Sequence, residues 1–428
     1  METTGKEAAP RLAGGGDSRT GNVVAGVLKW VEPWFSAYGV VGILVLGVAP
    51  IFMPVTVDAA GGDATAVGLV VAAFYVGGLF APVLSSLTDR RGWQRIVFVG
   101  CFPAMAAGVA AFAFVEGTWL WALFALIFGG AGSLACSVAG LFVVEAHPRE
   151  EWNQRLSWFR LAYGAGQVVG LVIAAVAVAE LKTGWLITAA LLLAGTVLAR
   201  IKLPALGPAA AEPRPAGAGP LAGLAGKYGL FLLMWLLVMT GVQTFFNVVP
   251  LVMRDAFDVS ASISSWLFLA GAAVGTLCYP LAGTLAGRWG AGQVLLLGIA
   301  MMTVSFGVMF GVSHVHAGGM AYIGGAGLVI AAIAYTFVVA AATMMIAGLA
   351  PGSEGSAMGL LNGIIAGGAV IGALVPSYVA KALGYSSLTA MAAGILILAA
   401  LVGIPLFRRS LWLGGAHGQA AHSSPTHS

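Results

Sequence analysis

The sequence predicts an all-α membrane protein with twelve transmembrane helices in two pseudo-symmetric six-helix bundles. Three observations predict it: few charges, twelve apolar runs long enough to cross a bilayer, and an internal repeat. Charged residues make up 8% of the 428 residues and hydrophobic residues 60%, whereas a soluble domain carries about 25% charged residues. This small number of charges cannot cover a surface that faces water. The apolar side chains are therefore expected to face lipid.

The twelve runs each reach the length that a membrane span requires. A helix that crosses about 30 Å of hydrocarbon needs about 20 apolar residues. Residues 22–34, which place Lys29 and Glu32 among Val, Leu and Trp, predict an amphipathic interfacial helix ahead of the first span. The predicted spans are 35–55, 66–88, 95–115, 119–145, 157–179, 183–201, 229–252, 263–287, 293–313, 319–349, 357–380 and 386–407.

Basic residues gather on one side of this topology. Twelve spans place both termini on the same side, and seventeen of the twenty Lys and Arg residues fall there; the exceptions are Lys182, Arg254 and Lys381. By the positive-inside rule that side is cytoplasmic, which predicts a multi-pass protein of the cytoplasmic membrane with both tails inside. The same rule accounts for the net charge of +4, so no nucleic-acid partner is expected.

A break rich in Pro, Ala and Gly divides the spans six and six. Such a composition predicts a flexible linker outside the bilayer. The predicted organisation is a tail with lead-in helix at 1–34, an N-terminal bundle at 35–201, a cytoplasmic linker at 202–228, a C-terminal bundle at 229–407 and a tail at 408–428.

The two halves repeat at an offset of 198 residues. The segment GGLFAPVLSSLTDRRG at 77–92 aligns with GTLCYPLAGTLAGRWG at 275–290, and the matches include Pro82 with Pro280. A weaker echo pairs Gly166-x-x-x-Gly170 with Gly368-x-x-x-Gly372. Parallel six-helix repeats are a known transporter plan, with the substrate site near mid-membrane where the repeats meet.

Residues 85–95, S-S-L-T-D-R-R-G-W-Q-R, resemble the major facilitator signature G-x-L-x-D-R-x-G-R-K/R. Asp89, Arg90 and Gly92 match it, and Arg95 lies one place beyond its last basic position. The resemblance extends over the whole chain in span number, linker position and repeat. It implies the major facilitator fold and a secondary transporter that resembles the twelve-span small-molecule and drug efflux permeases.

The resemblance also implies a gate at the cytoplasmic face. In the family the aspartate meets the start of helix 11, and the basic residues contact an acidic residue that ends helix 4, here Glu145. Arg288 is the second-half counterpart of Arg90. The alternative is that these charges only anchor helix ends to water.

Two departures weaken the inference of a proton-coupled antiporter. Drug antiporters of the family carry an arginine in helix 4, whereas 119–145 contains neither Lys nor Arg. They also carry a Gly-Pro pair in helix 5, which is absent here. All sixteen acidic residues fall in tails, loops or predicted helix ends, so no mid-membrane carboxylate is available to carry a coupling proton. Arg160 is the deepest basic residue, and snorkelling to the interface is its alternative role.

Uncharged polar residues inside the spans are the candidates for a substrate cavity. Interhelical hydrogen bonding is the alternative for each of them. The residues are Gln243, Phe246 and Asn247 in helix 7, Tyr163 and Gln167 in helix 5, Tyr335 in helix 10 and Asn362 in helix 11.

A cavity of this kind is apolar with a few hydrogen-bonding groups, which favours export of a lipophilic or amphipathic small molecule. Uptake of a neutral nutrient or small organic acid is one alternative, and a non-transporting receptor or scaffold on the same fold is another. We find no H-E-x-x-H, G-x-S-x-G or phosphate-binding loop, so neither an enzyme nor a cofactor or metal is expected. The expected partners are the substrate, a coupling proton and the bilayer, and the expected state is a monomer.

Overall fold

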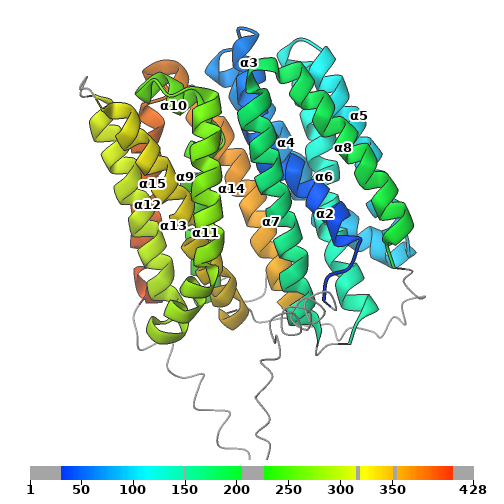
Figure 1. Cartoon of the computed structure of the whole chain (residues 1–428). Coiled ribbons are helices and arrows are strands. Elements are labelled where there is room, and N and C mark those ends of the chain that lie inside the picture. Colours follow the sequence, from blue (N-terminus) through cyan, green and yellow to red (C-terminus); the bar gives the residue numbers. More distant parts are fainter. Residues whose placement is uncertain (1–29, 149–150, 205–225, 315–318, 350–353, 408–428) are drawn as a thin grey trace, which may run out of the picture.

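The computed structural model describes residues 30–148, 151–204, 226–314, 319–349 and 354–407, and Figure 1 shows them as two helical bundles side by side. Trp30 and Phe407 lie at the same end, which we name the tail face; the opposite end is the far face. The predicted tails and most of the linker (205–225) lie outside the described residues. So does most of the predicted interfacial helix, and its described end, 30–34, forms turns instead of helix.

The N-terminal half holds six spans. The first is composite, with α2 (Phe35–Gly42), the π-helical turn η1 (Ile43–Val48) and α3 (Ala49–Ala59). Eleven helical stretches of the described chain are long and apolar enough to cross a membrane, and one of them, Trp158–Lys202, has 45 residues. The 3-10 turn η3 (Val178–Glu180) divides it into two spans. The other spans are α4 (Ala64–Arg91), α5 (Gln94–Phe114), α6 (Thr118–Ala146), α7 (Trp152–Ala177) and α8 (Leu181–Lys202).

The C-terminal half holds the other six spans, so the described residues form the twelve that the sequence predicts. Helix 7 is broken after Phe246, and its second piece is a short helix at the far face. The elements are α9 (Lys227–Phe246), α10 (Val249–Phe257), α11 (Ala261–Trp289), α12 (Ala291–Ser313), α13 (Met320–Leu349), α14 (Glu354–Leu383) and α15 (Ser387–Phe407).

The repeat is visible in the backbone. Gly92 after α4 and Gly290 after α11 both adopt positive φ, 67° and 94°, which glycine tolerates and other residues rarely adopt. The irregular turn of helix 1 ends at Val48, and helix 7 breaks after Phe246, a position 198 residues later. The two halves therefore interrupt their first helix at the same place.

The glycine echo marks equivalent helix contacts. Gly166 of α7 lies against the Gly39 carbonyl of α2, and a Cβ at Gly170 would be 2.8 Å from the Cα of Gly47 in η1. The fifth span, α7 (helix 5), therefore packs closely on the first span (helix 1). In the other half, a Cβ at Gly368 of α14 would be 2.6 Å from the Cβ of Met239 in α9. The eleventh span, α14 (helix 11), therefore packs on the seventh span, which begins with α9 (helix 7). Small residues allow this approach between membrane helices.

Candidate functional site

Two helix pairs join the halves along the seam, α4 with α14 and α7 with α11 (Figure 1). On the first pair, Gly68 of α4 lies against the Ser377 side chain and the Ala373 carbonyl. On the second, the Ser262 hydroxyl donates to the Ala175 carbonyl at 2.6 Å. The contacts place the faces of α4, α7, α11 and α14 along the boundary where a substrate site of this fold lies.

Two ion pairs connect the halves at the far face. Arg254 of α10 pairs with Asp58 at the end of α3, Nη1 to Oδ2 at 2.6 Å, and Lys381 of α14 pairs with Asp63 at 2.7 Å. Arg254 and Lys381 are two of the three basic residues that depart from the predicted charge asymmetry. We name these four residues the far-face ion pairs; together with the seam contacts they close this end of the molecule.

At the tail face, by contrast, a charge cluster lies within the N-terminal half. Glu32 Oε1 is 3.0 Å from Arg155 Nη1 and 3.1 Å from His147 Nε2, and its Oε2 accepts from Trp34 Nε1 at 2.8 Å. Arg155 also pairs with Glu151 at 2.8 Å. The cluster fastens the segment before helix 1 to the connection between helices 4 and 5. Sequence reasoning did not predict it, because Glu32 is more than 100 residues away from His147 and Arg155.

The predicted gating residues lie at or next to helix ends. The side chains of Asp89, Arg90 and Glu145 lie outside what the structure describes, so their contacts stay a prediction. Arg95 donates from Nη2 to the Arg200 carbonyl at the end of α8, at 3.2 Å. Arg288 is exposed in the last turn of α11. Gly92 forms the positive-φ turn after α4.

An aromatic stack lines the inside of the N-terminal half. Tyr38 of α2 stacks on Phe159 of α7, with centroids 3.9 Å apart, and on Tyr163, at 4.7 Å. The Cys136 thiol of α6 donates to the Tyr163 hydroxyl at 3.6 Å. Tyr163, a predicted cavity residue, therefore belongs to an ordered aromatic group that Tyr38 and Phe159 complete.

A second aromatic group lies in the C-terminal half. The ring of Phe246 is 5.3 Å from Phe268 of α11 and 6.2 Å from Tyr335 of α13. Tyr75 of α4 is partly buried and packs against its neighbour Phe74, with ring centroids 4.9 Å apart. Sequence reasoning selected Phe246 and Tyr335 but not Tyr75, which follows Phe74 in an apolar run with no polar residue beside it.

The predicted amides differ in their surroundings. Asn247 is 2% exposed and donates from Nδ2 to the Ala369 carbonyl of α14 at 3.1 Å, which is the interhelical role. Its Oδ1 is buried with no hydrogen-bond partner among the described residues. Gln243 and Gln167 are half-buried, and Asn362 is exposed. Gln243 packs closely on α14, because a Cβ added at Gly372 would lie 2.9 Å from the Cβ of Gln243.

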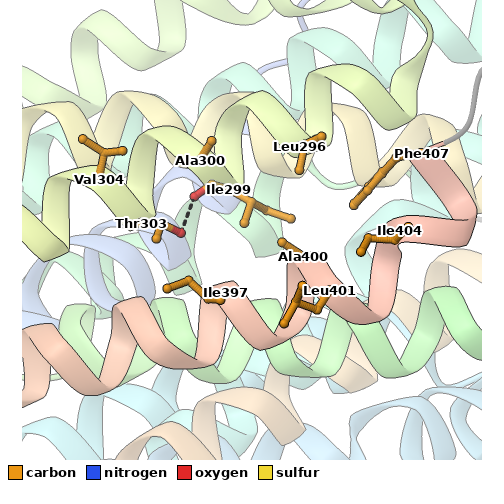
Figure 2. A pocket seen from close by; sticks show the side chains of 10 residues that line it. All are labelled: Leu296, Ile299, Ala300, Thr303, Val304, Ile397, Ala400, Leu401, Ile404 and Phe407. Carbon is orange, nitrogen blue, oxygen red and sulfur yellow. Dashed lines mark hydrogen bonds between the residues drawn. The ribbon is translucent and has the colours of Figure 1, made fainter.

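A groove of about 520 Å³ lies elsewhere, between α12 and α15 (Figure 2). Its lining is apolar apart from Thr303, whose hydroxyl donates to the Ile299 carbonyl of its own helix at 2.8 Å. These two helices pack only within the C-terminal half. The groove is therefore on the lipid-facing flank and away from the seam. Its residues are Leu296, Ile299, Ala300, Thr303, Val304, Ile397, Ala400, Leu401, Ile404 and Phe407.

Solved structures with the same fold include the nucleoside transporter NupG, with a TM-score of 0.71 at 15% identity over 88% of this chain and 97% of that one. A mutant of NupG gives a TM-score of 0.72 at 14% identity, covering 89% of this chain and 100% of that one. The human organic anion transporter MFSD10 (TETRAN) gives 0.61 at 18% identity, covering 88% and 98%. No curated protein sequence matches the chain.

The family comparison covers nearly all of the described residues. The family model described as Major Facilitator Superfamily matches residues 34–324 and again 231–411. Each match includes spans of the C-terminal half, and the first contains the whole N-terminal half. This chain belongs to the major facilitator superfamily, and it is a multi-pass membrane transporter, not an enzyme.

Proposed function

We propose that the protein exports a small lipophilic or amphipathic molecule across the cytoplasmic membrane by alternating access. The observation that carries the proposal is the pair of aromatic groups, Tyr38–Phe159–Tyr163 in the N-terminal half and Phe246–Phe268–Tyr335 in the C-terminal half. Aromatic rings offer large apolar contact area, and their hydroxyls add a few polar contacts. The tail face is the cytoplasmic side in this proposal, because the predicted topology assigns seventeen of the twenty basic residues to the side that holds both termini.

Transport requires the far face to open and the tail face to close in turn. The far-face ion pairs hold one of these states, and Asp89, Arg90 and Glu145 are proposed to hold the other. A ligand or a charge change shifts such an equilibrium only by its differential affinity for the two states. The coupling proton is proposed to bind at the tail face, at Glu32 or Glu145, because the described spans place no carboxylate between the aromatic groups.

Flux into proteoliposomes tests the proposal. A panel of lipophilic compounds is followed with and without an imposed pH gradient, for the wild type and Asp89→Asn. Asp258→Asn is the matched control, because Asp258 is exposed at the far face with φ 54°, a conformation that asparagine also accepts. Gradient-driven movement that is lost in Asp89→Asn and kept in Asp258→Asn supports an exporting antiporter. Movement of no compound refutes export of lipophilic molecules and favours uptake of a neutral nutrient.

A further inference from the structure

Three basic residues of the N-terminal half gather at the tail face, where the start of α5 packs against the end of α8. Arg95, in the first turn of α5, donates from Nη2 to the carbonyl of Arg200, in the last turn of α8, at 3.2 Å. Lys202 is the last residue of the same helix, and all three side chains are exposed. We name Arg95, Arg200 and Lys202 the basic corner.

The basic corner has no acidic partner in the described part of the chain, because none of the ion pairs found there includes its residues. The negative end of the α8 dipole faces the Arg95 guanidinium, but it is equivalent to only about half an elementary charge. Like charges that are held together repel, and an anion bound beside them removes this repulsion. The charge of the corner is therefore complementary to an anion.

Apolar side chains border the basic corner on the outside of the bundle. Ile96 of α5 is 73% exposed and Ile201 of α8 is 67% exposed, and Val197, one turn earlier in α8, is also exposed. Exposed side chains of this kind face lipid in a membrane protein. Trp93, just before α5, is exposed as well, and tryptophan is enriched at the level of the lipid headgroups. The basic corner therefore lies where headgroups meet the acyl chains.

We propose that the basic corner binds the phosphate of an anionic lipid in the leaflet at the tail face, with the acyl chains along Ile96 and Ile201. Arginine binds a phosphate through two parallel N–H donors, and lysine adds a point charge. Basic pockets between membrane helices bind anionic headgroups in this way. A zwitterionic lipid carries the same phosphate, but the three cations repel its positive group. The inference concerns a lipid partner, and it depends on neither the substrate nor the direction of transport.

Native mass spectrometry of the full chain tests the preference with two lipids that share their acyl chains and differ in headgroup. The probes are dioleoylphosphatidylglycerol, which is anionic, and dioleoylphosphatidylcholine, which is zwitterionic. The wild type is expected to retain the anionic lipid about tenfold more tightly, a ratio that corresponds to the attraction of one or two basic residues. Equal retention of the two lipids would overturn the inference.

A double variant assigns the preference to the basic corner. Arg200→Gln with Lys202→Gln is expected to weaken binding of the anionic lipid about tenfold and to leave the zwitterionic lipid unchanged. The hydrogen bond from Arg95 can persist in this chain, because its acceptor is a backbone carbonyl. Arg200→Lys with Lys202→Arg keeps both charges and should keep the preference. The matched control is Lys182→Gln with Lys227→Gln, which also removes two exposed cations, one at the far face and one at the start of α9.

Thermal unfolding establishes that each variant is folded before its lipids are compared. Binding of the anionic lipid that is unchanged in Arg200→Gln/Lys202→Gln, or that falls equally in Lys182→Gln/Lys227→Gln, would overturn the inference.

A soluble phosphate compound is the other source of the same chemistry, and glycerol 1-phosphate tests for it by calorimetric titration. It carries the phosphate without acyl chains, so it lacks the apolar contacts and is expected to give no detectable heat of binding. Binding of glycerol 1-phosphate to the wild type that is lost in Arg200→Gln/Lys202→Gln would assign the basic corner to a soluble ligand and refute the lipid.

Discussion

Arg254 on α10 donates to both carboxylate oxygens of Asp58, at 2.6 and 3.1 Å, and joins the first helix of the N-terminal half to the C-terminal half. A bidentate arginine–carboxylate contact has a defined geometry and is stronger than a single hydrogen bond. The Arg254 side chain is 53% exposed, and exposed pairs contribute about 1 kcal/mol or less. The pair therefore biases the equilibrium between open and closed far faces without locking it.

Asp58→Asn is expected to increase the open population of the far face about two- to fivefold, because loss of about 1 kcal/mol changes a population ratio by that factor. The measurement is the distance between spin labels at Ala60→Cys and Leu383→Cys, both exposed at the far face in different halves. The three native cysteines, Cys101, Cys136 and Cys278, are replaced by serine in the labelled chain.

The charge-exchanged variant provides the control for this pair. Asp58→Arg combined with Arg254→Asp keeps opposite charges facing each other, so its distance distribution should return toward that of the wild type. An Asp58→Asn chain with the wild-type distribution would show that the ion pair does not contribute to closure.

The second far-face pair should resist acid. The hydrogen bond from Lys381 lowers the pKa of Asp63 below its usual range, and hydrogen bonds from the Thr65 hydroxyl and the Ala66 N–H lower it further. A carboxyl whose pKa is lowered by its partners keeps them above its ordinary pKa and loses them only as the pH falls through the lowered value. The spin-label distances at the far face should therefore be the same at pH 8 and pH 5.

An open population that grows between pH 8 and pH 5 would contradict this expectation and would place a proton-sensitive group among the contacts of the far face. The effect of salt is the contrasting control. Both partners are largely exposed, at 58% for Lys381 and 46% for Asp63, so an ionic strength of about 1 M, where the Debye length is about 3 Å, should increase the open population.

Hydropathy and charge predicted the twelve spans to within a few residues, because lipid imposes a length and a composition on every helix that it surrounds. Neither property detects a change in hydrogen-bond register. The π-helical turn at 43–48 and the break after Phe246 were therefore not predicted, although both lie within correctly placed spans.

Only the part of the site whose residues stand out locally within a span was predicted from the sequence. Phe246 and Tyr335 stand next to polar residues within a span, and Tyr163 lies four residues before Gln167 in the same span. The partners of Asp58 and Asp63 are 196 and 318 residues away along the chain, and no local pattern encodes such a pairing. The sequence did single out Arg254 and Lys381 as exceptions to the charge asymmetry, and this was the available sign of their role.

Substitution by alanine should have different effects on the free energy of unfolding at Gly166 and at Gly164. A Cβ at Gly166 would enter the Gly39 carbonyl and lie 3.1 Å from the Ile43 nitrogen, whereas a Cβ at Gly164 would meet nothing within 4 Å. Gly166→Ala is expected to separate helices 1 and 5 and to lower the free energy of unfolding by about 1–3 kcal/mol. Gly164→Ala, on the same helix, should be neutral or stabilise by up to about 1 kcal/mol.

Thermal unfolding of the purified variants in one detergent provides the comparison. Equal melting temperatures for Gly166→Ala and Gly164→Ala would show that helix 5 can move away from helix 1 at no cost. That result would contradict a packing role for the glycine motif, and it would leave the motif without the structural explanation that its contacts supply.

Glu32 is expected to be the most consequential carboxylate of the tail-face cluster, because it accepts from Arg155 and Trp34 and lies 3.1 Å from His147. Glu32→Gln removes the charge and leaves Arg155, whose side chain is 11% exposed, with Glu151 as its remaining carboxylate partner of the cluster. A hydrogen bond to a charged group contributes about 1.5–3 kcal/mol, so the segment before helix 1 should detach from the connection between helices 4 and 5.

Hydrogen exchange read by mass spectrometry should then be faster at residues 151–158 and unchanged in the far-face turn at 60–63. Glu116→Gln, which removes an exposed carboxylate from the turn before α6, should leave both regions as they are. If exchange at 151–158 were the same in Glu32→Gln and Glu116→Gln, the anchoring of this connection would have to come from the Glu151–Arg155 pair and the aromatic packing of Trp34 instead.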